Sequence, residues 1–129
     1  MYVMKEEFKT GIDFIDEQHQ ALFDIANKTY YLLKDEFSID KYDTIVSLIE
    51  ELREYSIYHF RAEEEYMEKI KYKRLFSQKV EHDNFIRKFD ELDLNLIDEN
   101  QDEQISYILD FLNNWLCDHI IHNDKFIGK

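Results

Sequence analysis

A long stretch with helical periodicity carries an imidazole and a carboxylate where apolar side chains are expected. Leu48, Leu52 and Tyr55 follow one another at gaps of three and four residues, and the same spacing continues to His59 and Glu63. Four residues of an α-helix turn through about 400°, so His59 and Glu63 project from nearly the same face, one turn apart. A buried carboxylate is costly unless a positive charge or hydrogen bonds compensate it. Either this face meets water, or something cationic lies inside.

Helix breakers are almost absent from the chain, since its 129 residues include no Pro and only 2 Gly. This composition predicts an all-α fold of long helices with short connections. We expect an extended N-terminal arm over residues 1–11 and helices over residues 16–36, 41–67, 74–98 and 102–123. Asp13 or Asp16 is the expected cap of the first helix. Short connections make sequential helices antiparallel neighbours, so residues 1–129 are predicted to form a single-domain, up-down-up-down four-helix bundle.

The charge and cysteine content narrow the class of protein. The chain has 29 acidic and 16 basic residues and a net charge of −13, which argues against nucleic acid as a partner because phosphate binding needs a basic surface. Cys117 is the single cysteine, so no intrachain disulfide is expected. No apolar run approaches the ~20 residues of a membrane span, and the N-terminus lacks the apolar core of a signal peptide. We therefore expect a cytoplasmic protein without a membrane partner.

Four histidines are predicted to meet at one end of the bundle. His19 lies near the start of the first expected helix, His59 near the end of the second, His82 early in the third and His119 near the end of the fourth. Because helix direction alternates, these positions fall at the same end, each on an apolar face. A single such histidine is more often a core residue that bonds a neighbour than a ligand. Four at one level, with two carboxylates, predict a metal site, because a cation compensates the buried charge.

The donor types restrict the metal. Imidazole and carboxylate suit iron, zinc or manganese, and the lack of thiolate argues against a structural Cys-type zinc site. His122 lies one turn beyond His119 and is interpreted as a solvent-side residue. Cys117 is expected to point away from the site, and Glu64 and Glu65 are expected to be solvated.

The chain resembles the hemerythrin family over nearly its whole length. The residues that carry the resemblance are Gly11-Ile12-Asp13 before Asp16-Glu17-Gln18-His19, His59-Phe60 with Glu63, His82 with Phe85, and Trp115 before His119-Ile120 with Asp124. The resemblance implies a non-haem di-iron centre inside a four-helix bundle, with two iron ions joined by an oxo or hydroxo bridge.

The resemblance also implies a role for each matching residue. His19 and His59 would hold the iron that has an open position, Glu63 and Asp124 would bridge the two irons, and His82 and His119 would hold the other iron. In the family that other iron has a third histidine, one turn before the position of His82, where this chain has Gln78. Either the Gln78 amide oxygen ligates the iron, or the side chain stands off and leaves water there. His122 is a further, less favoured substitute.

Reversible binding of molecular oxygen, as carrier, store or supplier, is the function that the resemblance implies, and the chain is then not an enzyme. The candidate walls around the oxygen are Leu22, Phe23, Tyr55, Trp115 and Ile120. The alternative is a di-iron enzyme or sensor that acts on oxygen, peroxide or nitric oxide. Ferritin-like oxidases use Glu-x-x-His pairs and about four carboxylates, whereas this chain has no Glu-x-x-His. A metal-free interaction bundle is a third class.

Overall fold

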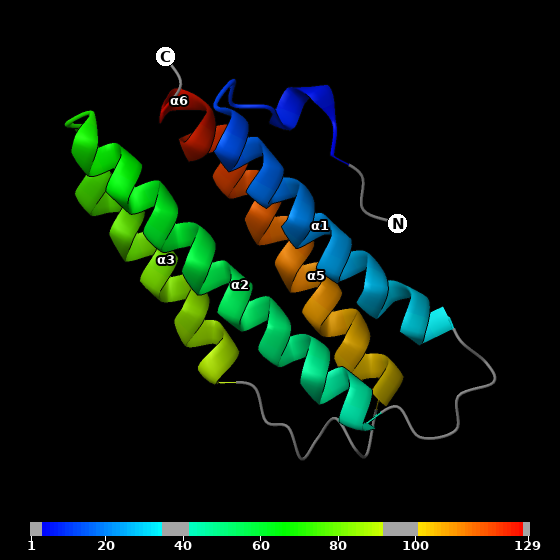
Figure 1. Cartoon of the computed structure of the whole chain (residues 1–129). Coiled ribbons are helices and arrows are strands. Elements are labelled where there is room, and N and C mark those ends of the chain that lie inside the picture. The colour runs from blue at the N-terminus through cyan, green and yellow to red at the C-terminus, as the bar shows by residue number, and fades with distance from the viewer. Residues whose placement is uncertain (1–3, 35–41, 92–100, 128–129) are drawn as a thin grey trace.

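Four long helices lie side by side in the computed structural model, which describes residues 4–34, 42–91 and 101–127. They are α1 (Asp13–Lys34), α2 (Tyr42–Lys69), α3 (Leu75–Asp90) and α5 (Gln101–His119). Successive helices run in opposite directions (Figure 1), with α1 packed against α2 and α5, and α2 packed against α3. A π-helix, η2 (Ile120–Asp124), and the short α6 (Lys125–Ile127) continue α5. The predicted all-α, antiparallel four-helix bundle is confirmed.

The start of α1 differs from the prediction. The helix begins at Asp13, so Asp13 and Asp16 lie inside its first turn and neither caps it. The Asp16 carboxylate instead accepts hydrogen bonds from the Thr10 backbone N–H at 2.8 Å, the Thr10 hydroxyl at 2.9 Å and the Gly11 N–H at 3.2 Å. Gly11 has φ +86, a conformation that glycine adopts without steric cost. Asp16 therefore fixes the turn that leads into the helix.

The other boundaries lie close to those predicted. The expected arm contains a single 3-10 turn, η1 (Glu6–Phe8), and α2 runs two residues beyond its expected end. Within the described residues α3 ends at Asp90; the remainder of the helix expected over 74–98, and the last two residues of the one expected over 16–36, lie outside the described part. The fourth helix is α-helical only to His119, where the π-helix replaces it.

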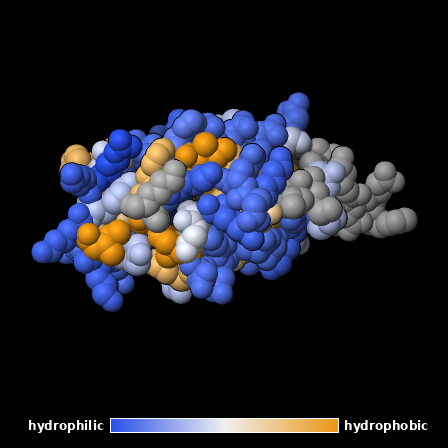
Figure 2. All heavy atoms as spheres, turned by 90° about the horizontal axis from the view of Figure 1, so that it is seen from above, coloured by the Kyte–Doolittle hydropathy of each residue, from blue (hydrophilic) through white to orange (hydrophobic). Residues whose placement is uncertain are grey.

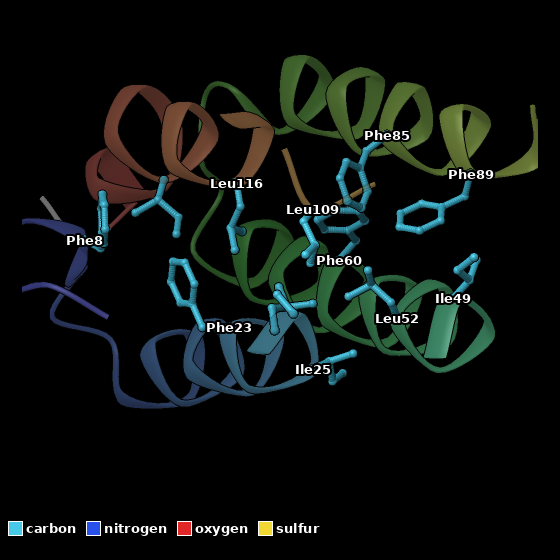
Figure 3. Packing of buried hydrophobic residues seen from close by; sticks show 13 residues of the cluster. Phe8, Phe23, Ile25, Ile49, Leu52, Phe60, Phe85, Phe89, Leu109 and Leu116 are labelled. Atoms are coloured by element: carbon cyan, nitrogen blue, oxygen red, sulfur yellow. The ribbon is translucent and has the colours of Figure 1, made fainter. Parts of the chain in front are cut away.

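Two apolar clusters fill the bundle at different levels. The larger one is rich in Phe and runs along most of the length, with Phe8 and Phe23 toward one end and Phe89 toward the other (Figure 3). The smaller one joins Ile15, Met67 and Ile127. Ile15 lies one turn before His19, and Met67 lies one turn after Glu63. The predicted site residues therefore lie between two apolar layers.

The face of the molecule shown in Figure 2 is largely polar. Hydrophilic side chains cover most of the face seen in Figure 2, and hydrophobic residues appear there only in a few places. None of the helices in the described part of the chain combines the length and the apolar character needed to cross a membrane.

Candidate metal centre

All seven residues predicted for the site are buried, with at most 3% of their surface exposed. Every helix of the bundle contributes, together with the π-helix. The residues are His19, His59, Glu63, Gln78, His82, His119 and Asp124. Residues that are far apart in sequence thus meet at one level, as the alternating helix directions predicted.

Six of these residues form two overlapping groups of donor atoms. One group is His19, His59, Glu63 and Asp124, and the other is Glu63, His82, His119 and Asp124. Within each group the donor atoms lie within 4.8 Å of one another. Two donors on opposite sides of an ion, at roughly 2.1 Å each, are about 4.2 Å apart. Each group therefore has the size of one ion site, and the two sites share both carboxylates.

A change of helix type allows Asp124 to join His119. The two residues are five positions apart, and five residues of a regular α-helix turn through about 500°, which leaves their side chains roughly 140° apart. The π-helix over Ile120–Asp124 closes its hydrogen bonds over five residues instead of four. Residues five apart then come to nearly the same face. The spacing that resembles the family thus requires this local geometry, which helical periodicity alone did not predict.

Many inner atoms of the site lack hydrogen bonds, although His82 Nε2 lies 3.2 Å from His119 Nε2 within hydrogen-bond geometry. Among the described residues, the buried side-chain atoms without a hydrogen-bond partner are His19 Nδ1 and Nε2, His59 Nε2, both Glu63 oxygens, Gln78 Oε1, His119 Nδ1, Asp124 Oδ2, Glu81 Oε2 and Ser56 Oγ. Two pairs of these atoms nevertheless lie close together: His59 Nε2 is 2.6 Å from Glu63 Oε2, and His19 Nε2 is 3.0 Å from Asp124 Oδ2. The angles between the atoms of each pair do not allow a hydrogen bond. Unpaired buried lone pairs that crowd together fit a set of metal donors.

Outer partners hold the far nitrogens of three of the rings. His59 Nδ1 lies 2.7 Å from Gln18 Oε1, and His82 Nδ1 lies 2.9 Å from Glu64 Oε2. His119 Nδ1 lies 3.4 Å from Glu81 Oε2, without hydrogen-bond geometry. An oxygen acceptor beside Nδ1 favours a proton there and leaves the Nε2 lone pair directed inward. A metal-binding histidine usually has such a carboxylate or carbonyl oxygen as the partner of its second ring nitrogen.

Aromatic rings also fix two of the imidazoles. Phe60 stacks on His82 with ring centroids 4.0 Å apart and an interplanar angle of 5°. Trp115 stacks on His119 at 4.4 Å and 16°. Of the other predicted wall residues, Leu22, Phe23 and Ile120 are buried and Tyr55 is half-buried. The rings are therefore held by packing as well as by polar contacts.

Charge in the site is unevenly distributed. Burial, with the neighbouring His19, holds the pKa of His59 well below its usual value. Burial and the adjacent Asp124 carboxylate raise the pKa of Glu63 well above its usual value. Burial acts to lower the pKa of His119, but Asp124 and Glu81 outweigh it and raise the pKa to about 9. The raised pKa values of Glu63 and His119 favour their protonated forms beside the buried Asp124 carboxylate.

Gln78 lies beside the group that contains His82. Its Nε2 donates a hydrogen bond to Asp124 Oδ1 at 3.3 Å, while its Oε1 is buried without a partner. Asp124 Oδ1 is also the oxygen that lies 3.0 Å from His119 Nε2. The Gln78 amide therefore borders the His82 and His119 side of the site, as its position one turn before His82 suggested.

The polar residues that contact the site histidines from outside were not predicted from the sequence. Glu64 was expected to be solvated, which is wrong, because its carboxylate turns toward α3 and bonds His82. Gln18 and Glu81 were not predicted as supporting residues either, although each directly precedes a predicted histidine. Glu65 and His122 are exposed as expected. Cys117 is half-buried, and its Sγ lies 3.7 Å from Asn113 Oδ1 on the same helix.

Comparison with known proteins gives the same family as the sequence motifs. A model of the hemerythrin HHE cation binding domain matches residues 10–126. The chain belongs to the hemerythrin family. A bacteriohemerythrin of Clostridium acetobutylicum is 50% identical over 125 residues, which are 97% of each chain. One of Methylococcus capsulatus is 31% identical and covers 95% of this chain and 89% of its own.

Solved hemerythrin structures agree with this assignment. The crystal structure of a wild-type hemerythrin matches with a TM-score of 0.76 at 25% identity, over 99% of this chain and 95% of that one. The buried groups of His, Glu and Asp in this hemerythrin-family chain are thus consistent with the cation binding that the domain model names.

The outer contact of His82 leads to a testable expectation. Replacing Glu64 with Ala should weaken the affinity for a divalent metal about 10–100-fold, because the His82 ring loses the acceptor that orients it. The affinity can be measured by competition of Co²⁺-loaded protein with a chelator. Glu65→Ala, one residue further on the exposed face, is the matched control and should leave the affinity unchanged. Equal effects of the two substitutions would show that the Glu64 contact does not support the metal.

Proposed function

We propose that this hemerythrin-family chain holds two non-haem iron ions and binds molecular oxygen reversibly at one of them, as a carrier, store or supplier of oxygen. The proposal rests on one observation: two groups of buried donor atoms, several of them without a hydrogen-bond partner, share Glu63 and Asp124. His19 and His59 would hold one iron, His82 and His119 would hold the other, and both would share Glu63 and Asp124. Imidazole nitrogen with carboxylate oxygen is a donor set that suits iron.

The ion position between His19 and His59 would be the open one. Its group contains two imidazoles and the two shared carboxylates, whereas the other group also borders the Gln78 amide. When two ferrous ions are bound, they can supply two electrons to oxygen. The chain's own task is to exclude water and to hold the ligands still. The buried Leu22, Phe23 and Ile120, together with the apolar layer around Met67, serve the first of these tasks.

Gln78 favours a second candidate, a di-iron enzyme or sensor that acts on peroxide or nitric oxide. An amide oxygen is a weaker donor than an imidazole nitrogen, and the Gln78 NH₂ group bonds Asp124. An iron short of one imidazole has a position that exchanges readily. The carrier hypothesis remains the better supported one, since the site has four imidazoles and only two carboxylates, unlike the carboxylate-rich oxidases.

Iron content tests the ligand assignment. We expect two iron atoms per chain after anaerobic loading with ferrous iron, and loss of most of the iron in both His59→Ala and Glu63→Ala. These two residues supply a terminal donor and a bridging donor from one face of α2. Iron is counted by atomic emission against protein concentration, with His122→Ala as the control, because His122 is exposed. Full iron content in either site variant would show that α2 does not hold the metal.

Oxygen titration tests the function itself. The reduced, iron-loaded protein should be nearly colourless, gain a visible ligand-to-iron charge-transfer band with oxygen, and lose this band when oxygen is removed. The reversal is expected because the apolar surroundings hinder water and protons from releasing the bound ligand. Absorption spectra over several cycles of oxygen and vacuum provide the measurement. Steady oxygen consumption with a reductant, without a reversible band, would instead favour the enzyme.

Replacement of Gln78 by His tests the departure from the family pattern. We expect Gln78→His to slow both the loss of iron to a chelator and the autoxidation of the oxygenated protein, because an imidazole binds the second iron more tightly than an amide. Gln20→His, on the exposed face of α1, is the matched control. If neither rate changes relative to the parent, Gln78 lies outside the coordination sphere, and water completes the second iron.

A further inference from the structure

One buried hydroxyl has no partner. Ser56 on α2 is 0% exposed, and its Oγ makes no hydrogen bond within the described part of the chain. Thr29 on α1 is also buried, but its hydroxyl bonds the Ile25 carbonyl one turn earlier at 3.1 Å. That local bond is the usual way in which a helix satisfies a buried hydroxyl. Because a buried polar group without a partner is costly, the Ser56 hydroxyl requires an explanation.

The position of Ser56 relates it to the site. Ser56 lies one turn before His59 on the same buried face of α2, and Leu22 lies one turn after His19 on α1. The rings of His19 and His59 are 4.8 Å apart, and the two helices run antiparallel (Figure 1). Ser56 and Leu22 are therefore at the same level, on the side of the two imidazoles that faces the larger core cluster.

The core on that side of the two imidazoles is apolar. Leu22 and Phe23 from α1 and Ile120 from η2 are buried hydrophobic residues of the larger cluster. Phe60, one turn after Ser56, also points into this cluster (Figure 3). Ser56 is one turn before His59, which belongs to the ion position that we assign as open.

We propose that the Ser56 hydroxyl donates a hydrogen bond to a small anionic or electron-rich ligand bound at the metal position between His19 and His59. This inference rests on the proposed metal site, and it assigns the ligand a polar contact that none of the seven donors provides. The hydroxyl has no partner among the described residues, and the ligand would supply its acceptor. A ligand without a lone pair on its outer atom would gain nothing from Ser56.

The apoprotein provides the first part of the test, and it needs no metal. Ser56→Ala is compared with Ser106→Ala, an exposed serine of α5, because both changes raise helix propensity equally. If the Ser56 hydroxyl is unpaired, its removal should raise the Tm of the apoprotein at least as much as Ser106→Ala. A lower Tm for Ser56→Ala than for Ser106→Ala would show that the hydroxyl already has a structural bond, and would overturn the proposal.

The second part uses azide as the probe on the diferric protein. We expect Ser56→Ala to weaken azide binding about tenfold, the loss expected for one hydrogen bond to a charged acceptor. The azide stretching frequency should shift in D₂O for the parent and for Ser106→Ala, but not for Ser56→Ala. Unchanged azide affinity in Ser56→Ala, or the same D₂O shift in all three proteins, would overturn the proposal whatever the Tm.

These measurements separate the Ser56 proposal from the proposed function. Azide binding to the diferric protein does not require reversible oxygenation. If oxygen fails to bind reversibly while the azide results hold, Ser56 remains a ligand contact in an enzyme. If oxygen binds reversibly while Ser56→Ala behaves as Ser106→Ala, the oxygen-binding function stands and the Ser56 contact is wrong.

Discussion

Two buried carboxylates that share one place in the core are the constraint on which the structure depends. Glu63 and Asp124 come from different helices, have no exposed surface and belong to both groups of donor atoms. Burial, together with the adjacent Asp124 carboxylate, raises the pKa of Glu63 and favours its neutral form, because like charges in a low dielectric repel strongly. Two cations would relieve this repulsion more completely, and the four imidazoles are placed to complete their coordination.

The rest of the fold holds these groups in position. Alternating helix directions bring four histidines to one end, and the π-helix turns Asp124 back toward His119. The layer of Ile15, Met67 and Ile127 closes one side, and the Phe-rich cluster closes the other. Stacked aromatic rings, and side-chain oxygens next to the Nδ1 atoms, hold the imidazoles in place. A buried site that is packed in this way supports the proposed binding of a small ligand.

The parts of the structure that follow from periodicity could be predicted from the sequence. The four helices and the meeting of His19, His59, His82 and His119 required only apolar spacing and short connections. Asp124 could not be placed in this way, because a five-residue separation faces away from His119 in a regular helix; it came from the resemblance to the family. The π-helix supplies the physical explanation for the position of Asp124.

The residues that contact the histidines from outside the site could not be predicted from sequence spacing. Glu64 lies off the inward face of its own helix, and it bonds His82 only because α3 packs beside α2. Gln18 likewise supports a histidine of the neighbouring helix rather than His19, which follows it. Such contacts depend on how closely two helices approach and on their rotation. The role of Asp16 in the turn before α1 was missed for a similar reason, since its partners precede the helix.

Anomalous diffraction at the iron absorption edge, from crystals of the iron-loaded protein, tests the central claim most directly. The account predicts two peaks within about 4 Å of each other, both in contact with Glu63 and Asp124. One peak should also contact His19 and His59, and the other His82 and His119. A single peak, or two peaks that do not share these carboxylates, would contradict it.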